Sequence, residues 1–263
     1  VYAPARENWK KFARNLLTHR NPYTGMTWGE DPTLFAVSLT NENITVGNWN
    51  KQVPELYLDA YRNYLEKRNL ATEENLASRG ELFYRFLVDL NVDMIEDFSR
   101  FLREEIGYRG LITEINFRKQ TILSEIRDHL DFVDNHNYWD HPNSLPGRAW
   151  TFPRLHNQKS SIEAASWSPR TLMPSRIFGK PFTVSEINFV FPNRYRAESG
   201  PLLGAYASLQ DWDGLFRFTW AHEEKGVRHM NPINRFNLVD DSLSQVAERI
   251  TNLMFVRGDV KTA

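Results

Sequence analysis

Short apolar segments with strand character alternate along this chain with longer segments of helical periodicity. Five strands are expected, at residues 34–40, 110–116, 131–136, 181–186 and 215–220. Helices are expected at 7–17, across 54–105 with a break near 71–74, and at 120–130, 202–209 and 243–255. This alternation is typical of βα units, which build parallel sheets. With 263 residues and no repeat or linker, the chain is expected to form one α/β domain, 1–263.

One stretch departs from the alternation. Residues 143–180 are rich in Pro, Ser and Arg and show little periodicity, which predicts a long loop. Loops of that length in compact domains are usually functional or disordered. For the last helix, Asp240, Asp241 or Ser242 is available as N-cap.

Composition excludes several classes of protein. The net charge is −1 with no basic stripe, so nucleic acid is not expected as a partner. No apolar run approaches the ~20 residues of a membrane span, and the absence of cysteine excludes disulfides and Cys-based metal sites. The 8 Trp, 10 Tyr and 17 Phe residues suit a large core and also suit sugar binding. No cofactor and no metal are expected, and oligomeric state and compartment stay open, with a secreted or periplasmic protein as the guess.

The expected strand ends are unusually polar. The first ends in Asn41-Glu42, the third in His136-Asn137-Tyr138, the fourth in Glu186 and the fifth in Trp220. A carboxylate at the end of a buried strand costs desolvation unless something uses or satisfies it. Two such glutamates at one face of a barrel are what glycosidic cleavage needs, since one protonates the leaving oxygen and the other attacks or activates water. Structural salt bridges are the alternative for either glutamate.

Taken in order, these motifs resemble clan A of the glycoside hydrolases, particularly the cellulase-type family 5. The resemblance covers nearly the whole chain and implies a TIM (β/α)8-type barrel. It implies that Glu42 is the acid/base, that Glu186 is the nucleophile, and that the mechanism is a double displacement with retention. It further implies that Asn41 bonds the substrate 2-hydroxyl, that Tyr138 of the His136-x-Tyr138 motif bonds the nucleophile, and that Trp220 floors a sugar subsite.

Under this resemblance the five strands correspond to numbers four to eight of the barrel. Strands one to three are absent, so the barrel is expected to be incomplete and the chain to be a C-terminal portion whose N-terminus is missing. An open remnant of this kind leaves two sheet edges where a barrel has none. The expected partner is a β-linked oligosaccharide, polysaccharide or glycoside, with the sugar and the endo or exo mode of action open.

Several further residues are candidates for substrate contact. Trp139 and His141 follow the His-x-Tyr motif, with a loop anchor as the alternative for Trp139. His222 follows Trp220, and Asn188 bonds either sugar or backbone. On the second strand, Glu114 and Asn116 share one face by alternation and are expected to play a supporting role. One of Trp28, Trp49 and Trp150 is expected to be an outer sugar platform.

Two other classes compete with the glycosidase. A metal-dependent barrel hydrolase would use His136, His141, His222 and Asp140, although the chain has no helical His-Glu-x-x-His motif. A non-catalytic carbohydrate-binding remnant of a barrel would keep the aromatic pocket without turnover. A metal requirement identifies the first, and sugar binding without hydrolysis identifies the second.

Overall fold

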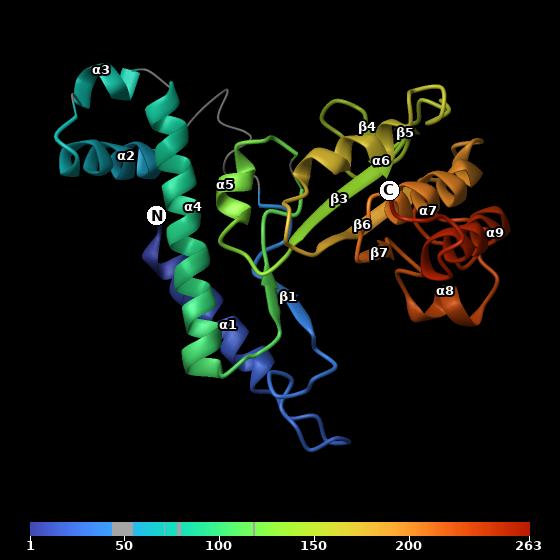
Figure 1. The fold of residues 1–263 in the computed structure, drawn as a ribbon, viewed down its shortest axis with the longest axis horizontal. Coiled ribbons are helices and arrows are strands. Elements are labelled where there is room, and N and C mark those ends of the chain that lie inside the picture. The colour runs from blue at the N-terminus through green and yellow to red at the C-terminus, as the bar shows by residue number, and fades with distance from the viewer. Residues whose placement is uncertain (44–54, 71, 78–79, 118) are drawn as a thin grey trace. The chain divides into compact units, whose positions relative to one another are not determined.

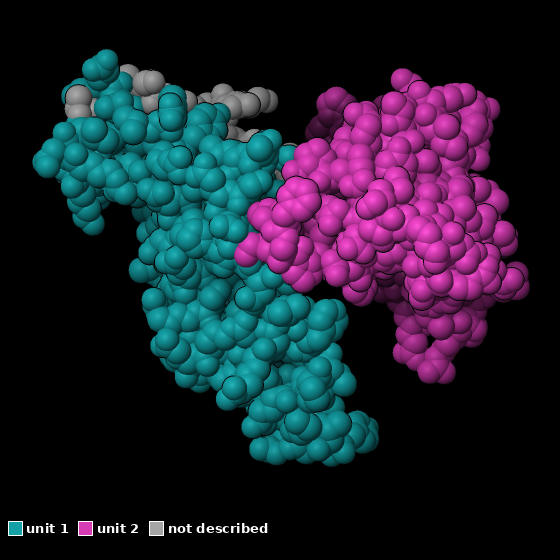
Figure 2. Space-filling view, in the orientation of Figure 1, with its two compact units in different colours: residues 1–132 teal, residues 133–263 magenta. Residues whose placement is uncertain are grey.

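The computed structural model describes residues 1–43, 55–70, 72–77, 80–117 and 119–263, so Trp49 and Pro54 lie outside the described residues. The chain separates into two compact units, Val1–Phe132 and Val133–Ala263, coloured teal and magenta in Figure 2. Each unit buries an apolar core of its own. The single domain predicted from the sequence stays a prediction.

The first unit combines helices with one pair of strands. In chain order it contains α1 (Ala3–Leu17), β1 (Ala36–Ser38), α2 (Glu55–Lys67), α3 (Thr72–Ala77), α4 (Glu81–Arg100), the π-helical η1 (Phe101–Ile106), β2 (Leu111–Thr113) and α5 (Leu123–Arg127) (Figure 1). Strands β1 and β2 pair in parallel, with Ala36 opposite Leu111. The predicted parallel relation of these two strands is therefore confirmed.

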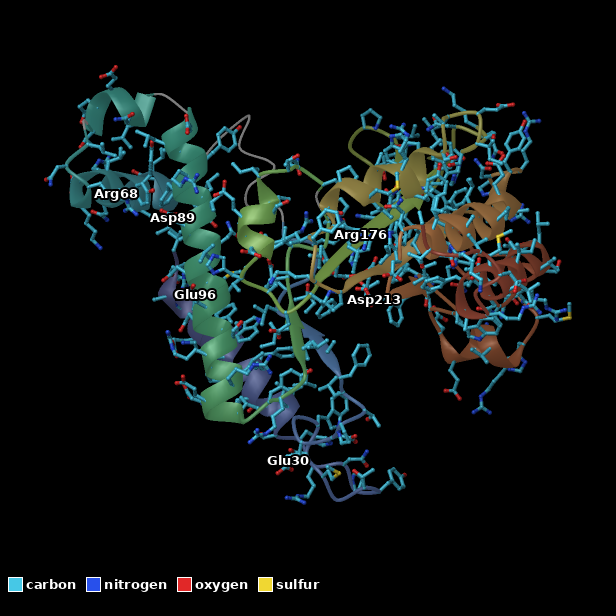
Figure 3. The ribbon with its side chains drawn as sticks, viewed as in Figure 1. Glu30, Arg68, Asp89, Glu96, Arg176 and Asp213 are labelled. Carbon is cyan, nitrogen blue, oxygen red and sulfur yellow. The ribbon has the colours of Figure 1, made fainter. Side chains whose placement is uncertain are left out.

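Helices α1 and α4 are held together by their apolar faces. The indole of Trp9 in α1 stacks on the ring of Phe98 in α4, with ring centroids 3.8 Å apart. A different contact joins α4 to the end of α2, where Arg68 Nη2 lies 3.2 Å from Asp89 Oδ2, and both residues are labelled in Figure 3. An exposed ion pair of this kind contributes only about 0–1 kcal/mol, less than the burial of an aromatic ring such as that of Phe98.

The second unit is built on a parallel sheet with strand order β3-β6-β7. Its elements are β3 (Val133–Trp139), β4 (Asn143–Ser144), β5 (Arg154–Leu155), α6 (Trp167–Leu172), η2 (Met173–Ser175), β6 (Phe182–Phe189), η3 (Arg196–Glu198), α7 (Ser199–Leu209), β7 (Gly214–Arg217), α8 (Glu224–Arg228), α9 (Ser242–Thr251) and η4 (Asn252–Val256). Helices α7 and α9 pack closely at Gly200, where a Cβ would lie 2.9 Å from the carbonyl carbon of Ala247. Of the three expected N-caps of α9, Asp241 takes the position.

One irregularity in the sheet decides where side chains point. Asn135 of β3 pairs with Val184 of β6, but the next residue, His136, pairs with Glu186. Ser185 is therefore the extra residue of a β-bulge, and the pairing of β6 with β7 shifts at the same place. A bulge lets two residues of one strand face a single residue of its neighbour.

Several boundaries differ from the sequence predictions. The long loop predicted at 143–180 is wrong, because this segment contains β4, β5, α6 and η2, and α8 was not predicted at all. These elements are too short to show a hydrophobic period. Glu186 was expected to end its strand but lies inside β6, and Trp220 lies three residues beyond the end of β7. The helix expected at 120–130 is limited to α5.

The fold is α/β with parallel strand pairs, as predicted. The five predicted strands correspond to β1, β2, β3, β6 and β7. Their membership of one incomplete barrel stays a prediction. No helix among the described residues combines the length and the apolar character needed to cross a bilayer.

Candidate active site

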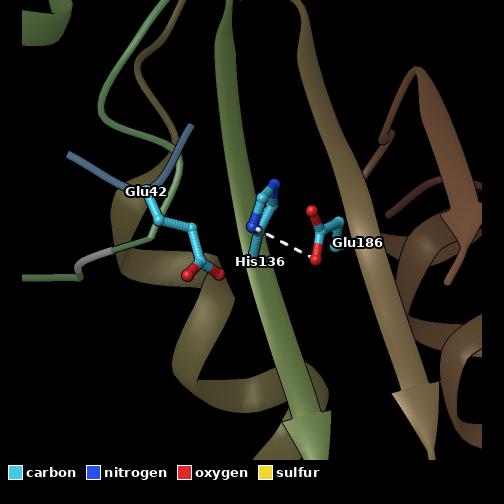
Figure 4. A group of neighbouring side chains, drawn as sticks. All are labelled: Glu42, His136 and Glu186. Atoms are coloured by element: carbon cyan, nitrogen blue, oxygen red, sulfur yellow. Dashed lines mark ion pairs between the residues drawn. The ribbon is translucent and has the colours of Figure 1, made fainter. Parts of the chain in front are cut away.

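Glu186, the predicted nucleophile, has two close polar partners in the second unit. The hydroxyl of Tyr138 donates a hydrogen bond to Glu186 Oε2 over 2.6 Å. His136 Nδ1 lies 3.7 Å from the same oxygen, and Figure 4 draws this ion pair between neighbouring strands. The sequence predicted the contact from Tyr138, and the geometry agrees with it. A hydroxyl donor stabilises the ionised carboxylate, which is the form that a nucleophile requires.

The β-bulge brings a second polar group to the other side of the imidazole. Ser185 Oγ lies 3.0 Å from His136 Nε2. Regular alternation would turn Ser185 and Glu186 to opposite faces of the sheet. Because the bulge places both opposite His136, one imidazole contacts the serine hydroxyl through one nitrogen and the glutamate through the other.

A buried carboxylate completes this group. Asp134 accepts hydrogen bonds from Ser185 Oγ, from Ser185 N at 2.9 Å and from Thr183 Oγ1 at 2.7 Å. Its burial raises the pKa of the carboxyl, against the opposing effect of the Ser185 and Thr183 hydrogen bonds and of His136. The side chains of Asp134 and His136 are only 3% and 1% exposed, so these contacts are shielded from water.

The proton on Asp134 sets the direction of hydrogen bonding through this group. With Asp134 ionised, Ser185 donates to the carboxylate and its oxygen accepts from His136 Nε2–H. With Asp134 protonated, the carboxyl donates to Ser185 and the serine hydroxyl is free to donate to Nε2, so that the imidazole proton lies on Nδ1, facing Glu186. The group therefore couples a buried proton on Asp134 to the position of the imidazole hydrogen beside Glu186.

Aromatic side chains surround Tyr138. Its ring meets those of Phe218, Phe236 and His141, with centroids 6.1, 5.4 and 5.5 Å away. His141 in turn meets the ring of Trp150 at 5.8 Å. An aromatic wall of this kind suits the apolar faces of sugar rings, and it fixes the Tyr138 hydroxyl toward Glu186.

Glu42 belongs to the first unit, where its backbone is held firmly. It lies beyond the end of β1 with a positive φ of 51°, and its N–H donates to Asn116 Oδ1 over 2.8 Å. Asn41, beside it, is exposed. The Glu42 side chain is half-buried and is drawn in Figure 4. The predicted supporting role of Asn116 is consistent with its hold on the Glu42 backbone.

Glu114 is a second carboxyl of the first unit and is fully buried. Burial raises its pKa, and a hydrogen bond from the Thr40 hydroxyl opposes that rise. Since Thr40 precedes Asn41 and Glu42, the bond ties β2 to the segment that carries Glu42. A positioning role therefore fits Glu114 better than a catalytic one.

Three of the predicted substrate contacts are occupied by protein groups. Asn188 donates to the carbonyl oxygens of Phe218 and Phe236, both at 2.9 Å, which matches the backbone alternative. Trp139 donates to Lys159 O and packs beside Trp167, which matches the loop-anchor alternative. The ring of His222 is bonded to Asn237 at 2.5 Å.

Trp220 and Trp150 are exposed enough to serve as sugar platforms, although the Trp150 ring also contacts Arg154 and His141. Their exposed fractions are 53% and 71%, and Trp28 is also exposed at 44%. The metal-dependent alternative stays untested. Its four candidate ligands each make a hydrogen bond within the second unit: His136, Asp140, His141 and His222.

Sequence reasoning missed Asp134 and Ser185. Asp134 lies two positions before His136, and Ser185 lies one position before Glu186. An acidic residue inside an apolar strand is a signal of a buried, satisfied charge, but its pairing with Ser185 depends on a bulge that alternation does not reveal.

Comparison with known proteins finds likeness in structure alone. No protein-family model and no curated protein matches the chain. An endo-beta-1,4-mannanase structure from Thermotoga petrophila matches with a TM-score of 0.57 at 15% identity, over 99% of this chain and 52% of that one. A second mannanase structure from Thermotoga petrophila RKU-1, with maltose and glycerol, matches with a TM-score of 0.57 at 17% identity, over 95% and 65%. A glycoside hydrolase family 5 mannosidase from Rhizomucor miehei gives 0.50 at 12%, over 95% and 58%.

These identities are low enough that the likeness shows the fold alone. The chain shares the parallel α/β fold of glycoside hydrolase family 5 enzymes, which are TIM barrels. It spans less than two thirds of the length of each of these three structures.

Proposed function

We propose that this chain carries the catalytic carboxylates of a retaining β-glycoside hydrolase, with Glu186 as nucleophile and Glu42 as acid/base. The five strands are then numbers four to eight of a (β/α)8 barrel. The observation that carries the proposal is the 2.6 Å hydrogen bond from Tyr138 to Glu186, on parallel strands whose sequence motifs occur in the order of the family.

The first step is a nucleophilic displacement. Glu186 attacks the anomeric carbon while Glu42 protonates the departing glycosidic oxygen, so that a glycosyl ester forms on Glu186. Tyr138 holds the attacking carboxylate in place. In the second step Glu42 removes a proton from water, which attacks the same carbon and releases Glu186. The configuration is retained because the carbon is inverted twice.

The names of the solved structures indicate which substrates to include in a test. Two of them are named endo-beta-1,4-mannanases and one a mannosidase, so β-mannosides belong in a substrate panel beside β-glucosides and β-galactosides. Asn41, His141 and Trp220 are proposed substrate contacts, with the exposed Trp220 indole as a subsite floor.

The test is turnover of aryl β-glycosides by the wild-type chain and by Glu42→Ala and Glu186→Ala. With azide present, Glu42→Ala is expected to yield a β-glycosyl azide and Glu186→Ala an α-glycosyl azide, as resolved by proton NMR. Glu223→Ala, which removes an exposed carboxylate next to His222, is the matched control and should keep wild-type rates.

Two outcomes contradict the proposal. Turnover that survives Glu186→Ala without azide would exclude Glu186 as nucleophile. A folded wild-type chain that binds sugars without hydrolysing any of them would support the carbohydrate-binding alternative.

A further inference from the structure

A cavity separate from Glu186 lies within the second unit. Its volume is about 510 Å³, within the range of small-molecule sites. Three segments distant in sequence line it, 152–156, 191–192 and 232–235. The first of these contains β5 and belongs to the stretch that the sequence predicted to be a loop.

Two arginines line this cavity without a carboxylate partner. Among the residues that the structure describes, neither Arg154 nor Arg235 forms an ion pair with an acidic side chain. Some arginines elsewhere in the same unit do so, since Arg196 binds Asp241 and Arg217 binds Glu248. Others, such as Arg170 and Arg194, form no ion pair among the described residues, so the distinctive feature of the cavity is that two such arginines line it together.

The two guanidinium groups are also close enough to disfavour each other. Burial, and secondly the charge of Arg154, lowers the pKa of Arg235. Arg154 Nη1 donates to Ser144 Oγ over 3.1 Å, while its Nε is buried with no hydrogen-bond partner. An uncompensated buried donor costs free energy that an anion placed in the cavity would return.

Aromatic rings hold both guanidinium groups in place. Arg154 lies over the ring of Trp150 at 5.0 Å and Arg235 over that of Phe152 at 4.6 Å. Such stacking leaves the in-plane N–H groups available, and those groups match the two oxygens of a carboxylate or sulfate. Asp140, whose Oδ1 lies 4.0 Å from Nδ1 of the lining His156, is already engaged by the N–H groups of Asn157 and Gln158.

The aromatic wall of the candidate active site leads to this cavity. Tyr138, which binds Glu186, meets the ring of Phe236, the residue after Arg235. A second series of contacts runs from Tyr138 to the ring of His141 and from there to the ring of Trp150. The guanidinium of Arg154 lies over that Trp150 ring. A chain of ring contacts within the second unit therefore connects Tyr138, the hydrogen-bond donor to Glu186, with both arginines.

We propose that Arg154 and Arg235 form a subsite for an anionic group, the carboxylate of a uronic acid or a sulfate ester, on a sugar of the glycan bound at Glu186. This inference rests on the proposed function, because it assigns the anionic group to the same glycan that Glu186 would cleave. It makes the substrate an acidic β-linked glycan, whereas the solved structures of similar fold are named for mannan.

Binding, rather than turnover, tests the subsite. Isothermal titration calorimetry on the Glu186→Gln chain, which leaves the ligand intact, compares β-1,4-mannotetraose, β-1,4-tetramannuronate and a 6-O-sulfated mannotetraose. The carboxylate and sulfate arms identify the source of the anion. At least one acidic tetramer is expected to bind at least about tenfold more tightly than the neutral one, since charge-assisted bidentate hydrogen bonds are the strong ones.

The arginine variants show whether that preference comes from the cavity. The double variant Arg154→Gln/Arg235→Gln is expected to bind the acidic and neutral tetramers about equally. Arg235→Lys is expected to show an intermediate preference for the acidic tetramer, because lysine keeps the charge without the planar guanidinium. Arg194→Gln is the matched control, since Arg194 also lies over an aromatic ring, that of Tyr195, but does not line the cavity. If a thermal melt shows that the double variant is not folded at the assay temperature, the Arg235→Lys variant provides the test instead.

The possible outcomes distinguish failure of the anion subsite from failure of the proposed glycosidase function. Equal binding of neutral and acidic tetramers, or a preference that survives in a folded double variant, would overturn the subsite. Inorganic sulfate that competes as well as the sulfated tetramer would mean an adventitious ion only. Because binding needs no turnover, failure of the azide test leaves this result standing, and failure here leaves Glu42 and Glu186 untouched.

Discussion

Replacing Ser185 by alanine removes the hydroxyl that joins Asp134 to His136. The backbone N–H of residue 185 and Thr183 Oγ1 still donate to Asp134, so one hydrogen bond to the carboxylate is lost out of three. His136 Nε2 also loses its contact at 3.0 Å. Both side chains are buried, so water does not replace the hydroxyl without rearrangement.

The magnitude depends on the charge of Asp134. A hydrogen bond to a charged group contributes about 1.5–3 kcal/mol and one between neutral groups about 0.5–1.5 kcal/mol. We therefore expect Ser185→Ala to lower the free energy of unfolding by about 2 kcal/mol when Asp134 is ionised and by about 1 kcal/mol when it is protonated. In a domain of this size, 2 kcal/mol corresponds to a fall in Tm of about 4–8 °C.

The sign of the pH dependence follows from the raised pKa of Asp134. A carboxyl whose pKa is higher in the folded state stabilises the fold fully below its unfolded pKa of about 3.9, and that stability is lost as the pH rises through the folded pKa. Loss of the Ser185 donor raises the folded pKa of Asp134 further. The destabilisation by Ser185→Ala should therefore be larger at about pH 8 than at about pH 4.

Urea unfolding followed by circular dichroism across this pH range measures the effect. Ser208→Ala is the control, because Ser208 Oγ donates only to the backbone carbonyl of Val260 and its loss should be independent of pH. Asp134→Asn should likewise remove the pH dependence of the Ser185 effect. A loss that is the same at both ends of the range would refute the coupling between Ser185 and the Asp134 charge.

Three further predictions concern separate features. Tyr138→Phe removes the 2.6 Å donor to Glu186 and should lower kcat/KM on aryl β-glycosides by about 10- to 100-fold, while unchanged rates would exclude that contact from the reaction. Gly200→Ala places a Cβ against the backbone of Ala247 and should cost about 1–3 kcal/mol of stability, seen as a lower Tm. In Asp241, burial opposes but the hydrogen bonds from Arg196 and Ser244 prevail to lower its pKa, so its stabilising effect is present above about pH 3.9 and lost as the pH falls through the folded pKa. Asp241→Asn should flatten acid unfolding in that range, and an unchanged acid transition would contradict the assignment.

Much of the fold was predictable because it depends on local patterns. The α/β alternation and the parallel pairs follow from apolar spacing. Capping chemistry limited the N-cap of α9 to three neighbouring residues, of which the structure selects Asp241. The contact of Tyr138 with Glu186 was expected from the resemblance of the His-x-Tyr motif to the glycoside hydrolase family, and the structure places both residues on neighbouring parallel strands. The elements within 143–180 were not expected, because two-residue strands and a six-residue helix have no measurable period.

The sequence by itself determined which residue types reach the candidate site, because strand alternation and motif order are properties of the chain read along its length. Only the tertiary structure decided that Ser185 and Glu186 both contact His136, since the bulge depends on how β6 pairs with two neighbours. It also decided the arginine cavity, whose three lining segments lie far apart in sequence. The physical reason is the same in both cases: these groups are brought together by pairing and packing between distant segments, and no local pattern encodes which distant segments meet.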